Sequence, residues 1–102
     1  MLWYNIMVSD INKVSNPTTV RARFAKYKGS DNAKLELSEK PDKKYKVVHD
    51  GKTTHFGSTL EDFTKHGDEA RRKNYLARSG GIKGDWKKDK YSANNLSRNL
   101  LW

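Results

Sequence analysis

The sequence predicts an α+β fold in which an antiparallel sheet of two hairpins packs against two C-terminal helices. Two stretches, residues 18–37 and residues 45–56, alternate apolar and polar side chains on either side of a turn, as the strands of a hairpin do. After residue 57 this alternation stops, and helix-capping residues and helical spacing of leucines replace it. The sheet is therefore expected before the helices along the chain.

The first hairpin begins with a strand expected at residues 18–28. Every second residue from Val20 to Phe24 is apolar and the residues between them are basic, so this strand would have one solvent-exposed, basic face. Residues 29–32 read Gly-Ser-Asp-Asn, which predicts a turn. Residues 33–37 then return as the antiparallel partner of residues 18–28.

Two features precede this hairpin. Residues 2–8 are apolar and are expected to extend the sheet, because they lack the basic start and the small-residue cleavage site of a signal peptide. Asn16 followed by Pro17 predicts a turn, since a residue before proline avoids the helical region.

The second hairpin follows a charged linker at residues 38–44. Its strands are expected at residues 45–50 and 52–56, which alternate in the same manner. Asp50 and Gly51 form the expected turn, and Asp-Gly is among the strongest short-range signals for a two-residue hairpin turn.

Serine and aspartate residues at helix-capping positions mark the two helical stretches that come next. Ser58, three residues before Glu61, has the spacing of a capping box and predicts a helical turn over residues 58–63. Asp68 is the expected N-cap of a helix over residues 69–78, with acidic residues in its first turn as the helix dipole prefers.

A loop and a last helix complete the chain. Residues 82–90 form a basic loop around Trp86, which is expected to insert into the core or into a partner. Ser92 is expected to cap the last helix, which has one apolar face made of Leu96, Leu100 and Leu101.

Composition restricts the class of protein. The 102 residues are expected to form one domain, with N-terminal strands in residues 1–40 and a hairpin and helices in residues 43–102. Only 34% of residues are hydrophobic, and no run approaches the roughly 20 apolar residues that span a bilayer, so no membrane partner is expected. The absence of cysteine excludes disulfides and thiolate metal sites, and no cofactor is predicted.

The formal net charge of +9 favours an acidic partner, either nucleic acid or an acidic protein surface. Binding of phosphates by such cations depends on salt and not on base sequence. The residues expected to bind the partner lie on the helix over residues 69–78 and in the loop after it, and they are Arg71, Arg72, Lys73, Arg78, Lys83, Trp86, Lys87, Lys88 and Lys90.

A metal site is an alternative interpretation of the polar residues. Three histidines and two nearby aspartates are the available ligands, namely His49, His55, His66, Asp62 and Asp68, but their spacings match no compact ligand motif. Residues 94–100 are similar to the asparagine-rich segment of the ββα-metal nucleases, although the helix after Ser92 contains no histidine. Polar histidines on strand faces and in loops are the simpler interpretation.

Several motifs in residues 43–102 occur together in a recognisable order. They are Lys43-Lys44-Tyr45, His55-Phe56-Gly57, Asp62-Phe63-Thr64-Lys65-His66-Gly67-Asp68, Arg71 or Arg72 with Tyr75 and Arg78, and Ser97-Arg98-Asn99-Leu100-Leu101-Trp102. In this order they resemble a family of small, uncharacterised proteins encoded by large double-stranded DNA viruses and tailed phages. The chain departs from that pattern at Ser79 and at residues 94–96. The resemblance implies a viral or phage setting and supplies no activity.

Three functions are compatible with these observations. The first is a non-enzymatic structural component of a virus or phage particle, such as a minor capsid, cement or connector protein, whose basic surface faces DNA or an acidic shell protein. Such a protein would lie in the virion as part of a larger assembly. The alternative is a small, sequence-independent DNA- or RNA-binding protein in the cytoplasm of the infected host cell. The third is a metal-dependent nuclease.

Overall fold

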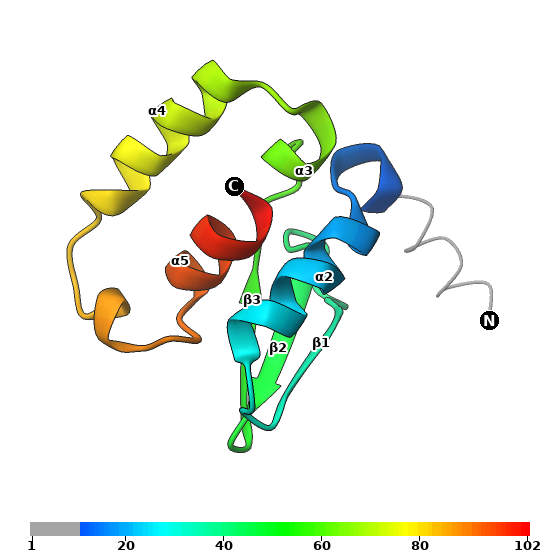
Figure 1. Cartoon of the computed structure of the whole chain (residues 1–102), viewed down its shortest axis with the longest axis vertical. Coiled ribbons are helices and arrows are strands. Elements are labelled where there is room, and N and C mark those ends of the chain that lie inside the picture. The colour runs from blue at the N-terminus through cyan, green and yellow to red at the C-terminus, as the bar shows by residue number, and fades with distance from the viewer. Residues whose placement is uncertain (1–10) are drawn as a thin grey trace.

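The fold is α+β, with a three-stranded antiparallel sheet and several helices (Figure 1). The computed structural model describes residues 11–102, so the strand expected at residues 2–8 lies outside the described residues. The elements in chain order are α2 (Pro17–Lys28), β1 (Ala33–Leu37), β2 (Tyr45–His49), β3 (Lys52–Phe56), α3 (Phe63–His66), α4 (Glu69–Gly80), the 3-10 turn η1 (Trp86–Lys88), α5 (Ala93–Leu96) and the π-helical turn η2 (Ser97–Leu101). Residues 11–14 are also helical. Within residues 11–102 no helix is long and apolar enough to cross a membrane.

The three strands pair in chain order, each antiparallel to the next. The hairpin expected around Asp50 and Gly51 is confirmed, and both turn residues have positive φ, at 51° and 74°. A two-residue type I′ turn requires this conformation at both positions. Leu35 pairs with Val47, which pairs with Thr54, so these three side chains share the face of the sheet that is turned to the helices.

The strand expected at residues 18–28 is wrong, because this segment forms α2. The side-chain oxygen of Asn16 accepts a hydrogen bond from the Thr19 N–H at 3.3 Å, which makes Asn16 the N-cap. Pro17 occupies the first helical turn, where its missing N–H has no partner to lose. The Asn-Pro pair that was interpreted as a turn is therefore a helix start.

The misleading alternation has a simple origin in helix geometry. Val20 and Phe24 are buried and lie one turn apart on α2, and a separation of four residues also fits a period of two. Ala22 between them is exposed. Residues 33–37 accordingly pair with β2, so the first expected hairpin does not exist.

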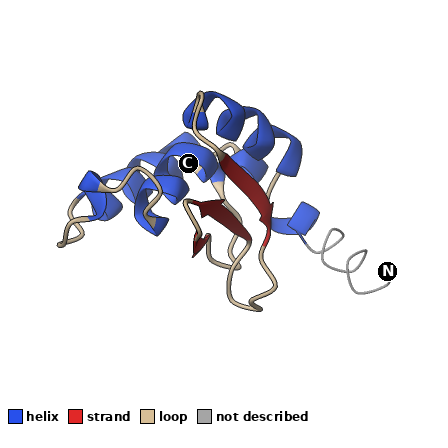
Figure 2. Cartoon of the chain, turned by 90° about the horizontal axis from the view of Figure 1, so that it is seen from below, coloured by secondary structure: helices blue, strands red, loops and turns tan. Residues whose placement is uncertain are grey.

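The core lies between the sheet and two helical segments on one of its faces. α2 and the C-terminal segment, which is α5 continued by η2, lie on the same side of the strands (Figure 2). The buried side chains that meet there include Val20 and Phe24 from α2, Tyr45, Val47 and Phe56 from the sheet, and Leu96, Leu100 and Leu101 from the C-terminal segment. The three leucines are at most 1% exposed, so the apolar face predicted for the last helix is confirmed.

Two of the three expected helix caps are confirmed. Asp68 Oδ1 accepts hydrogen bonds of 3.0 and 3.2 Å from two N–H groups in the first turn of α4, and Ser92 Oγ accepts one of 3.3 Å at the start of α5. The capping box at Ser58 is wrong, because Asp62 is the N-cap residue of α3. Ser58 Oγ instead accepts the N–H of Leu60 at 3.4 Å, in a local turn.

Candidate functional site

α4 lies beside the C-terminal segment, on its far side from α2 (Figure 1). Its residues from Glu69 to Arg78 are exposed or half-buried, and Ser79 is its one buried residue. A helix with so little apolar burial is held in place mainly by specific contacts. These contacts are made to the C-terminal segment by residues from Arg72 to Ser79.

Trp102 contacts Arg72 and Tyr75 in the first two turns of α4, and His66 at the end of α3. The Tyr75 ring stacks on the Trp102 indole with a centroid distance of 4.3 Å and an interplanar angle of 12°. The His66 ring lies 5.2 Å from the same indole. Arg72 Nε donates a 2.7 Å hydrogen bond to the Trp102 backbone oxygen. A stacked aromatic pair and a charge-assisted hydrogen bond thus fix this end of the helix.

Arg98 and Asn94 hold the last turn of α4. Arg98 Nη1 donates to the Leu76 carbonyl at 2.6 Å and to Ser79 Oγ at 2.7 Å. Asn94 Nδ2 donates to the Ser79 carbonyl at 2.9 Å. The Ser79 carbonyl is one of the last four that a helix leaves without an intrahelical partner, so the Asn94 bond helps to cap this end. α4 is consequently fastened to the C-terminal segment at several points from Arg72 to Ser79.

An open groove of about 660 Å³ lies between α4 and the rest of the protein. One wall is made by Arg71, Asn74, Tyr75 and Arg78, whose i, i+3, i+4, i+7 spacing places them on one side of the helix. The rest of the lining comes from the C-terminal segment, from the chain after β3 and from Lys44 just before β2, and it includes Leu101, Trp102, Gly57, Ser58, Leu60 and Glu61. The groove therefore combines an apolar floor with two guanidinium groups.

The four cations predicted on α4 point in different directions. A helix turns by about 100° per residue, so Arg71 and Arg78 point within about 20° of each other, and both line the groove. Lys73 points about 160° away from Arg71, and it does not line the groove. Arg72 faces the body, where it binds Trp102. The structure thus brings together two of the four predicted cations.

Arg71 and Arg78 are both unpaired within the described residues, as is Lys73 outside the groove. Arg72 Nη1 lies 3.1 Å from a Glu69 oxygen, whereas Arg71 and Arg78 form no ion pair with any carboxylate in residues 11–102. Glu61 is the exposed carboxylate in the groove lining. The two positive charges of Arg71 and Arg78 outnumber the one negative charge of Glu61, so the groove favours an anionic ligand.

Lys44, which lines the groove, forms a buried ion pair with Asp62. Lys44 Nζ is 3.3 Å from Asp62 Oδ2, and the two side chains are 3% and 0% exposed. Lys44 Nζ also donates a hydrogen bond to the Leu60 carbonyl. Burial lowers the pKa of the Lys44 ammonium, and the Asp62 carboxylate opposes this effect by raising it. Asp62 Oδ2 accepts no hydrogen bond within the described part of the chain, so the ammonium charge alone compensates it.

The other oxygen of Asp62 starts a chain of hydroxyl groups. Thr64 Oγ1 donates to Asp62 Oδ1 and lies 3.2 Å from Ser15 Oγ, while the Tyr45 hydroxyl donates to Ser15 Oγ at 2.8 Å. The Thr64 hydroxyl donates its only proton to the Asp62 carboxylate. In the hydrogen bond between Ser15 and Thr64, the Ser15 hydroxyl is therefore the donor. Burial raises the pKa of Tyr45 to about 12. This network joins β2, α3 and the segment before α2 beneath the groove.

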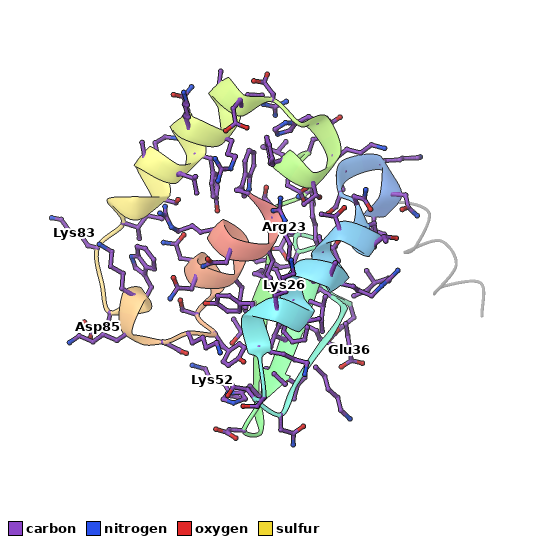
Figure 3. All side chains as sticks on the ribbon, viewed as in Figure 1. Arg23, Lys26, Glu36, Lys52, Lys83 and Asp85 are labelled. Carbon is purple, nitrogen blue, oxygen red and sulfur yellow. The ribbon has the colours of Figure 1, made fainter. Side chains whose placement is uncertain are left out.

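The predicted loop residues do not join Arg71 and Arg78. Trp86 is half-buried, its Nε1 donates to the Ile82 carbonyl at 2.7 Å, and its ring lies 5.6 Å from the Arg98 guanidinium carbon and 5.4 Å from Lys87 Nζ. Lys83 points away from the body beyond α4 (Figure 3).

The last two predicted cations form ion pairs of their own. Lys88 Nζ lies 3.8 Å from an Asp85 oxygen, between two exposed side chains. Lys90 Nζ lies 2.8 Å from Asp31 Oδ2, which also accepts a hydrogen bond from the Tyr91 hydroxyl at 2.7 Å. Lys90 thus serves to attach the loop to the start of the sheet, and its charge is already compensated.

The three histidines occupy three different environments. The His49 ring lies 4.4 Å from the Tyr91 ring, His55 Nδ1 lies 2.8 Å from Ser38 Oγ, and His66 Nδ1 accepts the N–H of Asp68 at 2.9 Å. Within residues 11–102 no group of three or more His, Asp or Glu side chains is placed to hold a metal ion.

Sequence reasoning missed three residues of the groove, Lys44, Asn74 and Tyr75. Tyr75 is half-buried and faces the groove. Its spacing from Arg71 and Arg78 was the available signal for one shared helix side. Lys44 carried no such signal, because its role depends on a partner that is distant in sequence.

One family model, described as a family of unknown function (DUF5754), matches residues 33–79. The matched region extends from β1 into α4 and contains Lys44, Asp62, Arg71 and Arg78. No curated protein and no solved structure matches the chain. The description of the family gives no activity, so the groove itself is the basis for a functional argument.

Proposed function

We propose that this protein is a non-enzymatic structural component of a viral or phage particle and that it binds nucleic acid through the phosphate backbone. The observation that carries the proposal is the pair Arg71 and Arg78, two guanidinium groups on one side of α4 that no described carboxylate neutralises. The net charge of +9 supports an anionic partner. The viral or phage setting rests on the sequence resemblance in residues 43–102.

The spacing of the two arginines suits a phosphate strand. Seven residues correspond to a rise of about 10.5 Å along a helix. One strand of duplex DNA rises about 3.4 Å of axis per phosphate while it winds around that axis, so the two guanidinium groups would contact different phosphates. A duplex lying along α4 would present phosphates to both guanidinium groups, each of which can form two parallel hydrogen bonds. The Asn74 amide lies between them as a further donor.

The aromatic residues near the groove favour backbone contacts over base contacts. Base stacking needs a free ring face. The Trp102 ring is already stacked on Tyr75, and the Trp86 ring has Arg98 and Lys87 over it. Binding through phosphates alone carries no sequence information, so we expect duplexes of unrelated sequence to bind with similar affinity.

Replacing Arg71 and Arg78 by alanine together is expected to weaken duplex binding and to reduce its salt dependence. Each lost phosphate contact removes about 0.9 from the slope of log K against log salt concentration, so the slope should flatten by about 1.8. Fluorescence anisotropy of a labelled duplex over a range of salt concentrations measures both effects. Lys73→Ala is the matched control, because it removes one charge from the same helix outside the groove.

Two results would contradict the proposal. One is a double variant whose salt slope equals that of Lys73→Ala, because the two arginines would then make no phosphate contact. The other is absence of duplex binding by the unaltered protein at low salt. The particle location is tested separately by mass spectrometry of purified particles, and absence of the protein from them would remove that part of the proposal.

An acidic shell protein is the second candidate partner, and the exposure of Leu60 favours it. Leu60 is 70% exposed and lines the groove, although an apolar side chain gains little from contact with phosphates. With a peptide of alternating leucine and glutamate as the probe, Leu60→Ser is expected to weaken binding of the peptide and to leave DNA binding unchanged. Ile82→Ser is the control, since Ile82 is 54% exposed and does not line the groove. Equal effects of the two variants would exclude this use of the groove.

A further inference from the structure

α2 carries four cations and no carboxylate over its length. Arg23 is used internally, because its Nη1 donates to the Leu100 carbonyl at 3.3 Å. Arg21, Lys26 and Lys28 form no ion pair within the part of the chain that the structure describes. Glu36 lines the same hollow as Arg21 but lies beyond ion-pair distance. α2 thus presents positive charge that the protein itself does not neutralise.

Two of these cations repeat the arrangement found on α4. Arg21 and Lys28 are seven residues apart, so they point within about 20° of each other with a rise of about 10.5 Å between them. Lys26 points about 140° away from Arg21. Ala22 and Ala25, on the exposed side of the helix, are small enough to let a phosphate backbone approach closely.

The two cation pairs lie on opposite sides of the C-terminal segment. Figure 1 shows α5 and the residues after it between α4 and α2. The contacts agree with this view, because Trp102 stacks on Tyr75 of α4 while the Leu100 carbonyl accepts from Arg23 of α2. Figure 3 shows Lys26 on α2 and Lys83 beyond the end of α4, at well separated places. One nucleic-acid segment on α4 therefore leaves α2 free for another.

We infer that α2 is a second phosphate-binding site and that the protein bridges two nucleic-acid segments, with Arg71 and Arg78 on one segment and Arg21 and Lys28 on the other. This inference rests on the proposed function, because it assigns a second site of the same chemistry. Two duplexes repel each other within a Debye length of about 10 Å at 0.1 M salt. A molecule with cations on two sides offsets this repulsion and releases counterions from both duplexes. The protein then compacts nucleic acid as well as binding it.

The test is a capture assay with two duplexes of unrelated sequence. One duplex is fixed to beads and the other is fluorescent, and capture of the second by the first is measured as protein is added at low salt. A two-site bridge gives capture that rises to a maximum and then falls, because excess protein saturates each duplex separately. Sedimentation of the free protein checks that self-association is not the source of the bridge.

Arg21→Ala combined with Lys28→Ala is expected to abolish capture while binding to a single duplex persists through α4. Lys26→Ala, on the other flank of α2, should retain capture, and circular dichroism confirms that each variant folds. Capture by the double variant equal to that of Lys26→Ala would overturn the inference. So would binding of single duplexes by the unaltered protein without any capture, and this result would leave the proposed function standing. Absence of single-duplex binding would overturn both.

Discussion

Replacing Asp62 by alanine is expected to lower the free energy of unfolding by about 3–5 kcal/mol, because it leaves a buried ammonium without its counterion. Lys44 Nζ lies 3.3 Å from Asp62 Oδ2, and both side chains are almost completely buried. The Leu60 carbonyl would remain as an acceptor, but a neutral oxygen does not replace a carboxylate. Urea denaturation at pH 7 measures the loss.

The pH dependence of this loss identifies its cause. Burial lowers the pKa of Lys44 in the folded protein, so the unfolded chain binds more protons between that pKa and the ordinary lysine value of about 10.4. Stability therefore rises with pH across this window. Asp62 raises the Lys44 pKa, and its removal extends the window to lower pH. The deficit of Asp62→Ala should shrink as the pH is raised toward 10.

A double variant separates the buried charge from the lost packing. Lys44→Met with Asp62→Leu removes both charges and keeps apolar volume, so it should recover most of the stability that Asp62→Ala loses. A single variant within about 1 kcal/mol of the unaltered protein would show that water reaches the pair, as it does for ordinary surface ion pairs. A deficit that is constant with pH would show that Lys44 does not titrate in response to Asp62.

The parts of the fold that were predictable are those with local signals. Asp50 and Gly51 specify a two-residue turn by their own backbone preferences, and the strands beside them follow from the alternation. Asp68 and Ser92 cap helices through hydrogen bonds within one turn of the cap. Each of these features depends on neighbours in sequence, so the sequence alone contains it.

α2 was mistaken for a strand because its few apolar residues fit both periods. Val20 and Phe24 satisfy a period of two and a period of 3.6, and the short segment contained too few apolar residues to distinguish them. The deciding signal was at the start, where Asn16 and Pro17 form a favoured N-cap and first helical position. The error also assigned Arg21 and Arg23 to one face, whereas a helix separates them by about 160°.

The groove could not be predicted because long-range contacts decide which cations remain free. Lys90 and Arg98 are cations like Arg71, and the sequence does not distinguish the three. In the structure, Lys90 forms an ion pair with Asp31, and Arg98 donates hydrogen bonds to the last turn of α4. The stacking of Tyr75 on Trp102 positions α4, and nothing local to either residue indicates it. Charge counting therefore predicted an anionic partner but not the residues that line the groove.

Replacing Gly57 by alanine is expected to destabilise the protein by about 2–4 kcal/mol, through two effects at the floor of the groove. Gly57 has a φ of 86°, a conformation that costs an L-residue about 1–2 kcal/mol. The added Cβ would lie 2.9 Å from Leu101 Cδ1 and 3.2 Å from Lys44 Cβ. Leu101 is 1% exposed and Lys44 is held by Asp62, so neither has free space to move into.

Gly51→Ala provides the matched control, because it introduces the unfavourable backbone conformation without the steric clash. Gly51 has a φ of 74°, and a Cβ there would meet no atom within 4 Å, so its loss should be about 1–2 kcal/mol. The difference between the unfolding free energies of the two variants, measured by urea denaturation, is the cost of the steric clash with Leu101 and Lys44. Because Leu101 precedes Trp102, the near-ultraviolet circular dichroism of the Trp102–Tyr75 stack should change in Gly57→Ala and not in Gly51→Ala. Equal losses of unfolding free energy in the two variants, with unchanged spectra, would mean that the C-terminal segment shifts without strain to make room for the added Cβ. In that case the segment does not hold α4 at a fixed distance from the groove floor.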